Sequence, residues 1–358
     1  MTQMVGNARP VLVLCLSAVV LVGWAGVADG AYAVHTGTWT DNAPTFVAGE
    51  TWTSPVNLAD ILDIAYYAGP GATGVAHVDV GGDVTCTTLS MGDDSRALLV
   101  VDGAMTTVGA YLGRDNGEAR IVVRNNGSMT FQGTVSMGWG VGASTSDLVI
   151  EDNTQVAFGG SGALNVGYVA GNTSAITQTG GDVTATSRIY VQYHADANGS
   201  YTISGGSLEQ TNAARDWAVG KTSGTGSGLF HVVGSGATIT NVAHLKVYET
   251  GTLAFTINDA GGVSVVNASD FTVASGLLDM NLDGYVPNLG DTFDLVSLSN
   301  GTADFAYANL TLAAGDVGTW ALVDPAGGST LQVQYMVPEP MTLALLAVGG
   351  LCGLRRRR

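Results

Sequence analysis

Seven acidic side chains are the residues of this sequence best suited to chemistry, and they cluster in segments typical of turns. Paired carboxylates can act as general acid and base when a glycosidic bond is cleaved. Solvated carboxylates in turns are far more common, however, and Lys or Arg is scarce at matching positions. We therefore expect no catalytic residue here, and a polysaccharide-cleaving enzyme stays the alternative. The seven are Asp93, Asp94, Asp115, Glu118, Asp147, Glu151 and Asp152.

No metal site is expected either. None of the five histidines has metal-ligand spacing, and we expect single structural or surface roles for them. The segment from Asp279 to Gly284 imitates the start of a calcium loop, but Gly290 stands where such a loop needs its last acidic ligand. A turn explains this segment better, so the sequence predicts no metal and no cofactor. The histidines are His35, His77, His194, His231 and His244.

Threonine pairs raise another possibility, which is binding to a flat lattice such as ice or crystalline polysaccharide. Thr-x-Thr steps occur at Thr85/Thr87, Thr184/Thr186 and Thr238/Thr240. Equivalent segments elsewhere carry Ala157-Phe158 or Glu209-Gln210 instead. Because a lattice-matching row must be unbroken, this binding mode is kept only as a second alternative.

A repeated unit must position all these side chains. Its mark is an apolar-x-apolar step, often followed by Gly, and successive marks lie 21 to 29 residues apart. A Gly- or Asn-containing turn and an apolar residue precede many marks, as at Gly81 to Val84 and Gly205 to Leu208. The marks are residues 62–64, 89–91, 110–112, 135–137, 164–166, 189–191, 217–219, 245–247 and 271–273.

A period in the twenties predicts a solenoid. The alternation between marks is typical of strands, and each unit has room for about three short strands and three turns. Residues 57–68 also show helical spacing, but we favour a strand through Ile61 to Tyr66 because its mark falls in phase. The sequence thus predicts an all-β, right-handed parallel β-helix, a pectate-lyase-like β-solenoid. The repeat also resembles the autotransporter-associated β-strand repeats.

The repeat is expected to occupy residues 34–274. Residues 275–336 change rhythm, and the stretch from Leu282 to Leu295 resembles the β-rich C-terminal cap of autotransporter-like passenger domains. A solenoid needs such a cap because an open strand edge would pair with another chain. The region of Trp39 and Trp52 could cap the other end.

The N-terminal residues 1–33 are typical of a secretory signal peptide. Arg9 precedes an apolar run over residues 11–24, and Ala31-Tyr32-Ala33 fits the small-x-small rule for cleavage by signal peptidase. We expect export through the Sec machinery and cleavage after Ala33. An uncleaved N-terminal anchor is the alternative.

The C-terminal residues 337–358 carry the most specific pattern. Val337, Pro338, Glu339 and Pro340 form a stiff, extended segment, because proline disfavours helix in the residue before it. An uncharged run over residues 341–354 follows, which is short for a membrane span. Four arginines end it and would be held on the cytoplasmic side of a membrane: Arg355, Arg356, Arg357 and Arg358.

This tail closely resembles the PEP-CTERM sorting signal of exopolysaccharide-producing Gram-negative bacteria and planctomycetes. The resemblance covers the whole tail and implies recognition of Pro338, Glu339 and Pro340 by an exosortase, a membrane protease that removes the tail outside the cytoplasmic membrane. The chain would then be anchored in the inner membrane only transiently. An ordinary short transmembrane anchor is the alternative.

Charge and cysteine content limit the partners and the sources of stability. The formal charge is −17. Removing Arg9 and Arg355–Arg358 from 13 basic residues, and Asp29 and Glu339 from 30 acidic ones, leaves 8 and 28, or about −20. Nucleic acid is excluded as a partner because its phosphates need Lys and Arg. Only Cys86 would survive processing, and we expect it to be a buried thiol without a disulfide.

These observations together predict an exported structural or adhesive protein of the cell surface or extracellular matrix. Its expected partners are exosortase, signal peptidase, the membrane before processing, and extracellular polysaccharide bound along loops of one face.

Overall fold

The computed structural model describes residues 33–34, 45–47, 50–52, 55–64, 73–78, 82–212, 214–258, 261–299, 309–316, 318–323 and 329–337. These residues form strands and turns, and they contain no α-helix. The strand expected in place of a helix near residue 61 is confirmed as far as Ile64, where β4 ends. Tyr66 lies outside the described residues.

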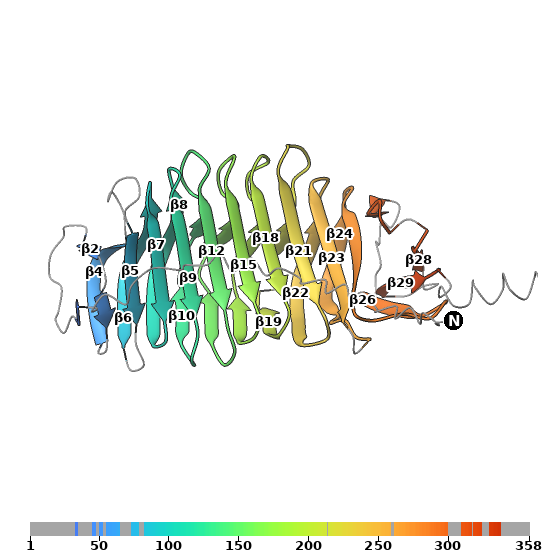
Figure 1. Cartoon of the computed structure of the whole chain (residues 1–358), viewed down its shortest axis with the longest axis horizontal. Helices are drawn as coiled ribbons and strands as arrows, with labels where there is room; N and C mark the ends of the chain where they lie inside the picture. The colour runs from blue at the N-terminus through green and yellow to red at the C-terminus, as the bar shows by residue number, and fades with distance from the viewer. Residues whose placement is uncertain are drawn as a thin grey trace, which may run out of the picture. The chain divides into compact units, whose positions relative to one another are not determined.

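One parallel sheet takes a single strand from each coil. Its strands stand side by side in Figure 1, running from the blue N-terminal coils to the orange C-terminal ones. In spatial order they are β1 (Ala33–Val34), β3 (Glu50–Trp52), β5 (Thr73–Val78), β7 (Arg96–Val101), β9 (Glu118–Val123), β12 (Thr145–Ile150), β15 (Thr173–Gln178), β18 (Asn198–Ile203), β21 (Ser227–Val233), β23 (Gly251–Asn258), β25 (Leu277–Asp283) and β27 (Thr311–Leu312).

The second sheet takes two stretches of chain from each coil. In some coils one long strand covers both stretches, and in the others a turn separates two short strands. The long strands are β4 (Pro55–Ile64), β6 (Asp83–Asp93), β8 (Ala104–Arg114), β22 (Ala237–Val247) and β24 (Val266–Val273). The short ones are β2 (Thr45–Val47), β10 (Ser128–Phe131), β11 (Val135–Met137), β13 (Gln155–Phe158), β14 (Ala163–Val166), β16 (Asp182–Ala185), β17 (Arg188–Val191), β19 (Gly206–Gln210) and β20 (Asp216–Val219).

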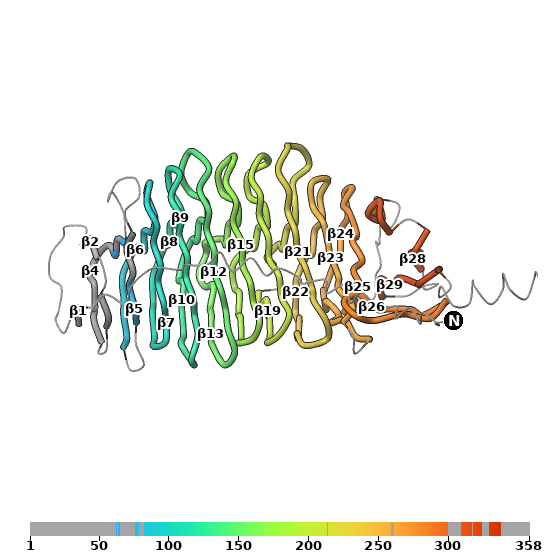
Figure 2. Tube along the Cα trace, viewed as in Figure 1, coloured from blue at the N-terminus to red at the C-terminus, as the bar shows by residue number. Residues whose placement is uncertain are grey.

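Strand register confirms the repeat and with it a parallel β-solenoid of about 8 turns. Every predicted mark pairs with the mark of the next coil: Leu62 with Leu89, Val135 with Leu164, and Leu245 with Phe271 are examples. The tube in Figure 2 follows these successive coils. The pattern of three strand segments per coil is therefore as the sequence predicts.

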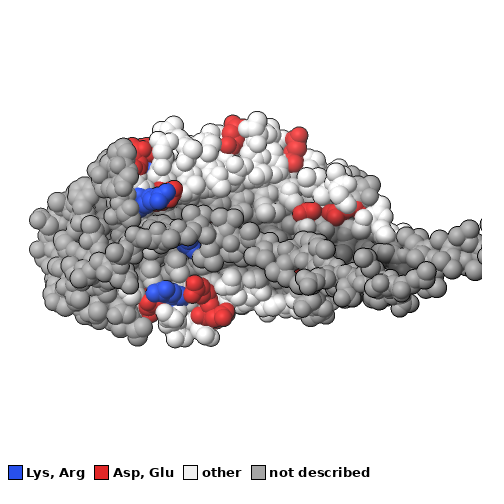
Figure 3. Space-filling model, viewed as in Figure 1, with Lys and Arg blue, Asp and Glu red and all other residues white. Residues whose placement is uncertain are grey.

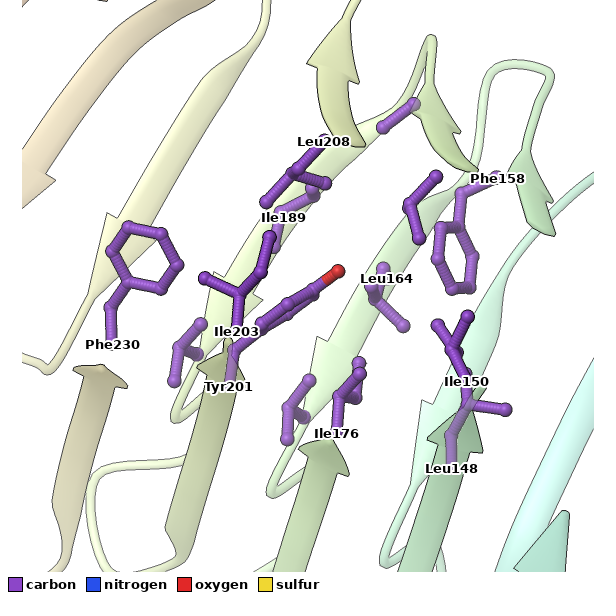
Figure 4. Close-up of a cluster of buried hydrophobic side chains, with 14 of the residues drawn as sticks. Leu148, Ile150, Phe158, Leu164, Ile176, Ile189, Tyr201, Ile203, Leu208 and Phe230 are labelled. Atoms are coloured by element: carbon purple, nitrogen blue, oxygen red, sulfur yellow. The ribbon is translucent and has the colours of Figure 1, made fainter. Parts of the chain in front are cut away.

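The core is the interior of the coils. Alternating residues of each strand point inward and are buried, so a row of apolar side chains runs through the stack. One row of the first sheet is Leu99, Ile121, Leu148, Ile176, Tyr201, Phe230, Leu253 and Leu278. Figure 4 shows its central members among other buried side chains. The hydroxyl of Tyr201 donates to Gln178 Oε1 at 2.8 Å, which satisfies a polar group inside the core.

The glycine after many marks turns the chain at one corner. Gly113, Gly138 and Gly220 have φ values of +65°, +71° and +81°, a region that disfavours residues with a Cβ. Gln192 takes the same place in its coil with φ +72°. Its side chain donates to the Ala195 carbonyl at 2.8 Å and accepts from Thr250, which holds the strained turn.

Antiparallel pairing begins near the C-terminus. β26 (Thr292–Leu298) is parallel to β24 but antiparallel to β29 (Thr330–Tyr335), and β28 (Trp320–Val323) adds to β29. Trp320 is buried there between Phe293 and Tyr335, whose ring centroids lie 5.9 and 5.1 Å away. β25 continues the first sheet beyond residue 274, where the sequence places the boundary between the repeat and the cap. That boundary stays a prediction.

The prediction of a turn over residues 279–283 is wrong. Asp279, Asn281 and Asp283 belong to β25, and they pair in register with residues 254, 256 and 258 of β23. The neighbouring coil imposes a strand because it offers an open edge of backbone donors and acceptors. The three side chains share one face of β25, where Asn281 Nδ2 donates to Asp279 Oδ2 at 3.0 Å.

Within the described part of the chain no helix is long and apolar enough to span a bilayer. The predicted membrane segment over residues 341–354 lies outside that part.

Candidate functional site

An aromatic ladder with a cation at each end follows one corner of the solenoid. Its members stand two residues beyond the last residue of successive marks, so the register of the second sheet brings them into one row. We define the aromatic ladder as Arg114, Trp139, Tyr168, Tyr193 and Lys221.

Contacts join Arg114 to Trp139, and they join Tyr168, Tyr193 and Lys221 to one another. The guanidinium carbon of Arg114 lies 4.9 Å from the Trp139 ring centroid. Tyr168 and Tyr193 stack with centroids 4.9 Å apart and planes 17° apart. Lys221 Nζ lies 4.9 Å from the Tyr193 centroid. The rings are therefore held in fixed orientations by their neighbours rather than left free to rotate.

Two further tyrosines widen the ladder. Tyr111 contacts Trp139 with centroids 5.1 Å apart, and Tyr190 meets Tyr193 edge-on at 5.5 Å. Tyr111 is 38% exposed and Tyr193 37%. Exposed ring edges and tyrosine hydroxyls form a surface that can contact apolar groups and also hydrogen-bond.

Sequence reasoning missed this ladder. The marks carried the needed signal, since the position two residues after each mark reads Asp, Arg, Trp, Tyr, Tyr, Lys from Asp93 to Lys221. That position is not part of the apolar pattern, so no periodicity of buried residues points to it.

Burial affects the end of the ladder at Lys221. Partial desolvation among the tyrosines lowers the pKa of its ammonium group from the usual value. Lys246, the other lysine, behaves in the opposite way: its hydrogen bond to Asp216, at 2.9 Å, raises its pKa.

The acidic residues that could have formed a catalytic ridge lie in separate places. Asp93 and Asp115 flank Arg114, at 3.8 and 3.0 Å, and burial raises the pKa of Asp93. Glu118 pairs with Arg96 at 2.9 Å on the first sheet, where Asp147 stands beside Arg120 in register. In Figure 3 several cations likewise lie beside carboxylates.

Of the remaining three acidic residues, Glu151 and Asp152 lie at another corner. They line a shallow depression of about 460 Å³ together with three asparagines, Val149 and Thr179. Asp94 accepts a hydrogen bond from Asn116 at 3.3 Å. The acidic residues are thus distributed over separate polar corners of the solenoid, where the hydrogen bonds and ion pairs are local.

The described histidines each have a hydrogen-bond partner. His77 Nε2 lies 2.6 Å from Asp102 Oδ2, and Asp102 also accepts from Arg124 Nε at 2.9 Å. Although burial opposes it, these bonds lower the pKa of Asp102. His194 accepts a hydrogen bond from the Asp196 amide, His231 bonds with Thr256, and His244 bonds with Asp270.

His35 lies outside the described residues. Among those that are described, no three His, Cys, Asp or Glu side chains come together as a metal site. Cys86 is buried, as expected, and its burial raises the pKa of the thiol to about 11.

A polar groove crosses four coils on the second sheet. It has a volume of about 540 Å³, and buried Val156 lies at its floor. Two outward rows line it, in strand register across β10, β13, β16 and β19. We define the polar groove by these rows: Ser128, Gln155, Asp182, Ser207 and Thr130, Ala157, Thr184, Glu209.

The second of these rows contains threonines of the lattice hypothesis. Register places Thr85, Thr106, Thr130, Ala157, Thr184, Glu209 and Thr240 in line. Ala157 and Glu209 interrupt the row, which is the interruption that the sequence indicates.

The terminal signals lie almost wholly outside the described residues. Ala33 belongs to β1 and Val337 ends the described part, while Ala31, Pro338, Glu339, Pro340 and Arg355–Arg358 are beyond it. The sorting and processing sites therefore stay predictions. Comparisons of the chain with protein-family models, curated proteins and solved structures found no match.

Proposed function

We propose that this chain is an exported structural or adhesive protein of the cell surface or extracellular matrix, which binds exopolysaccharide. The aromatic ladder is the observation that carries the proposal. Sugars carry C–H groups and hydroxyls, which suit the ring edges and the tyrosine hydroxyls of this row. Because the ladder repeats along the coils, it offers a row of contacts to a long polymer rather than a pocket for a small molecule.

The proposal assigns no catalysis to the chain. The acidic residues of the ladder's corner are occupied by ion pairs with Arg114, and the second acidic corner lacks a described Lys, Arg or His in its lining. A polymer held along many coils without being cut is what a matrix or adhesive protein requires.

The terminal patterns supply the route to the surface in this proposal. The N-terminal segment directs Sec export and is removed by signal peptidase after Ala33. The PEP-CTERM-like tail holds the chain in the inner membrane through residues 341–354 until exosortase acts at Pro338, Glu339 and Pro340. The solenoid is right-handed in this proposal, as in pectate-lyase-like proteins, with residues 275–336 as its cap.

Binding tests the ladder. The purified chain is mixed with soluble exopolysaccharide, and the double variant Trp139→Ala/Tyr193→Ala is expected to bind at least about tenfold more weakly. The control variant Trp139→Phe/Tyr193→Phe keeps both rings and should retain most of the affinity. Equal binding by the alanine variant and the unaltered chain would reject the ladder as the binding surface.

Processing tests the tail. In a host that produces exosortase, Glu339→Ala should leave the C-terminal segment attached, which mass spectrometry of the C-terminus detects. The matched variant Thr342→Ala, outside the tripeptide, should be processed normally. Cleavage of both chains alike would contradict exosortase sorting and leave the binding proposal untouched.

A further inference from the structure

We propose that the polar groove binds a polysaccharide that carries protonated primary amines, that is, a polymer of amino sugars. The groove lies over β10, β13, β16 and β19 and shares no residue with the aromatic ladder. The inference therefore does not depend on the function proposed for the ladder.

The shape of the groove suits an extended polymer. Neighbouring coils are spaced about 4.8 Å apart, so four coils give each lining row a length of about 14 Å between its end residues. The two rows stand two residues apart along each strand, which separates them by about 7 Å. A single glycan chain fits along such a trough, with the backbone of the sheet as a rigid base.

The lining chemistry is that of a site for hydroxyl and ammonium groups. Ser128, Thr130 and Thr184 supply hydroxyls that can donate and accept, and Gln155 supplies an amide. Side chains of this kind satisfy the hydroxyl groups of any sugar, so they do not by themselves select a charge.

Two carboxylates set the charge preference. Ser207 Oγ donates to Asp182 Oδ1 at 2.6 Å, and Asn241 Nδ2 donates to Glu209 Oε1 at 2.8 Å. Each bond orients its carboxylate, and the second oxygen of each accepts no hydrogen bond from a described residue. These oxygens are ready-made acceptors for an ammonium group, and a charged hydrogen bond is stronger than a neutral one.

The surroundings of the polar groove disfavour a negatively charged polymer. No Lys or Arg is among the residues that line the groove, and the whole chain has a formal charge of −17. An anionic polymer such as a polyuronate would be repelled. A neutral polymer would leave both carboxylates without a charged partner, so the amine-bearing polymer is the best match.

The test uses the full chain and oligomers of glucosamine, with fully N-acetylated oligomers of the same length as the neutral comparison. Calorimetry at a pH where the amines are protonated should show binding of the free-amine oligomer at least about tenfold tighter than the acetylated one. Added salt should weaken only the former, because it screens charge pairing. Equal affinity for the two oligomers, or no binding of either, would overturn the proposal.

Variants locate the site. The double variant Asp182→Asn/Glu209→Gln keeps the shape of the groove and should lose the preference for the free amine. Asp83→Asn is the matched control, since Asp83 is an exposed carboxylate in the same outward row, two coils before Ser128 and outside the groove. A loss of preference in the control, or its retention in the double variant, would refute this assignment.

Discussion

The ammonium group of Lys221 lies over the ring of Tyr193, 4.9 Å from its centroid, and also 5.4 Å from that of Tyr190. Partial burial lowers the pKa of Lys221, whereas the Asp216 carboxylate raises the pKa of Lys246. The unprotonated amine is the nucleophile in acylation. We therefore expect Lys221 to be acylated before Lys246 at mildly alkaline pH, as measured by peptide mapping with mass spectrometry.

The denatured chain is the control for that experiment, because both lysines should then react at similar rates. Faster reaction of Lys246 in the folded chain would show that the charge environment around Tyr193 is not as described.

Cys86 should make stability depend on pH in the alkaline range. Burial raises the pKa of its thiol from 9.0 to about 11, so the neutral thiol stabilises the folded chain fully below the ordinary pKa. This contribution is lost as the pH rises through about 11. Chemical unfolding across this range should show a smaller fall in the free energy of unfolding for Cys86→Ala than for the unaltered chain. Equal slopes of the free energy of unfolding against pH in the two chains would contradict this role of Cys86.

Asn172 should be essential to the fold, because one buried amide serves three backbone groups. Its Nδ2 donates to the carbonyls of Gly138 and Gly140, both at 2.8 Å, and its Oδ1 accepts from the Ser144 amide at 3.0 Å. Asn172→Ala should lower the free energy of unfolding by about 3–5 kcal/mol, since buried partners are left unsatisfied.

Urea denaturation measures that loss, and Asn281 provides the comparison, because its exposed side chain donates to Asp279 at the surface. Its replacement by Ala should change the free energy of unfolding by no more than about 0.5 kcal/mol. A small effect at Asn172 would mean that water replaces its amide at the corner.

Gly113 should not tolerate a side chain. Its φ is +65°, and an added Cβ would lie 2.5 Å from Ser146 Oγ and 2.6 Å from the Thr145 carbonyl oxygen. Gly113→Ala should therefore cost about 2–4 kcal/mol through backbone strain and crowding. Gly315→Ala is the control, because nothing lies within 4 Å of its added Cβ. Thermal unfolding followed by circular dichroism compares the two.

The coil could be predicted because its physical causes are local. Inward residues must be apolar and alternate with outward ones, and glycine must stand where φ is positive. Both requirements leave marks in the chain, and Leu62, Leu89 and Ala110 therefore lie in register as their spacing indicates. The strand near Ile61 was predictable for the same reason, because phase with the next coil outweighed its helical spacing.

Surface chemistry was less predictable, because stacking creates it. Trp139 and Tyr168 are 29 residues apart, and nothing local relates them to Arg114 or Lys221. Their common row exists only when coils of unequal length are aligned by hydrogen bonding. The same alignment divides the acidic residues among different corners and makes Asp279 to Asp283 a strand, since a neighbouring edge decides their conformation.

Within the marked coils, the sequence by itself thus determined which residues are inside, where the chain bends and how many residues return it to the next coil. Only the tertiary structure decided which outward side chains become neighbours. The physical reason is that burial and backbone geometry act on each coil alone, whereas a binding surface depends on the register between coils.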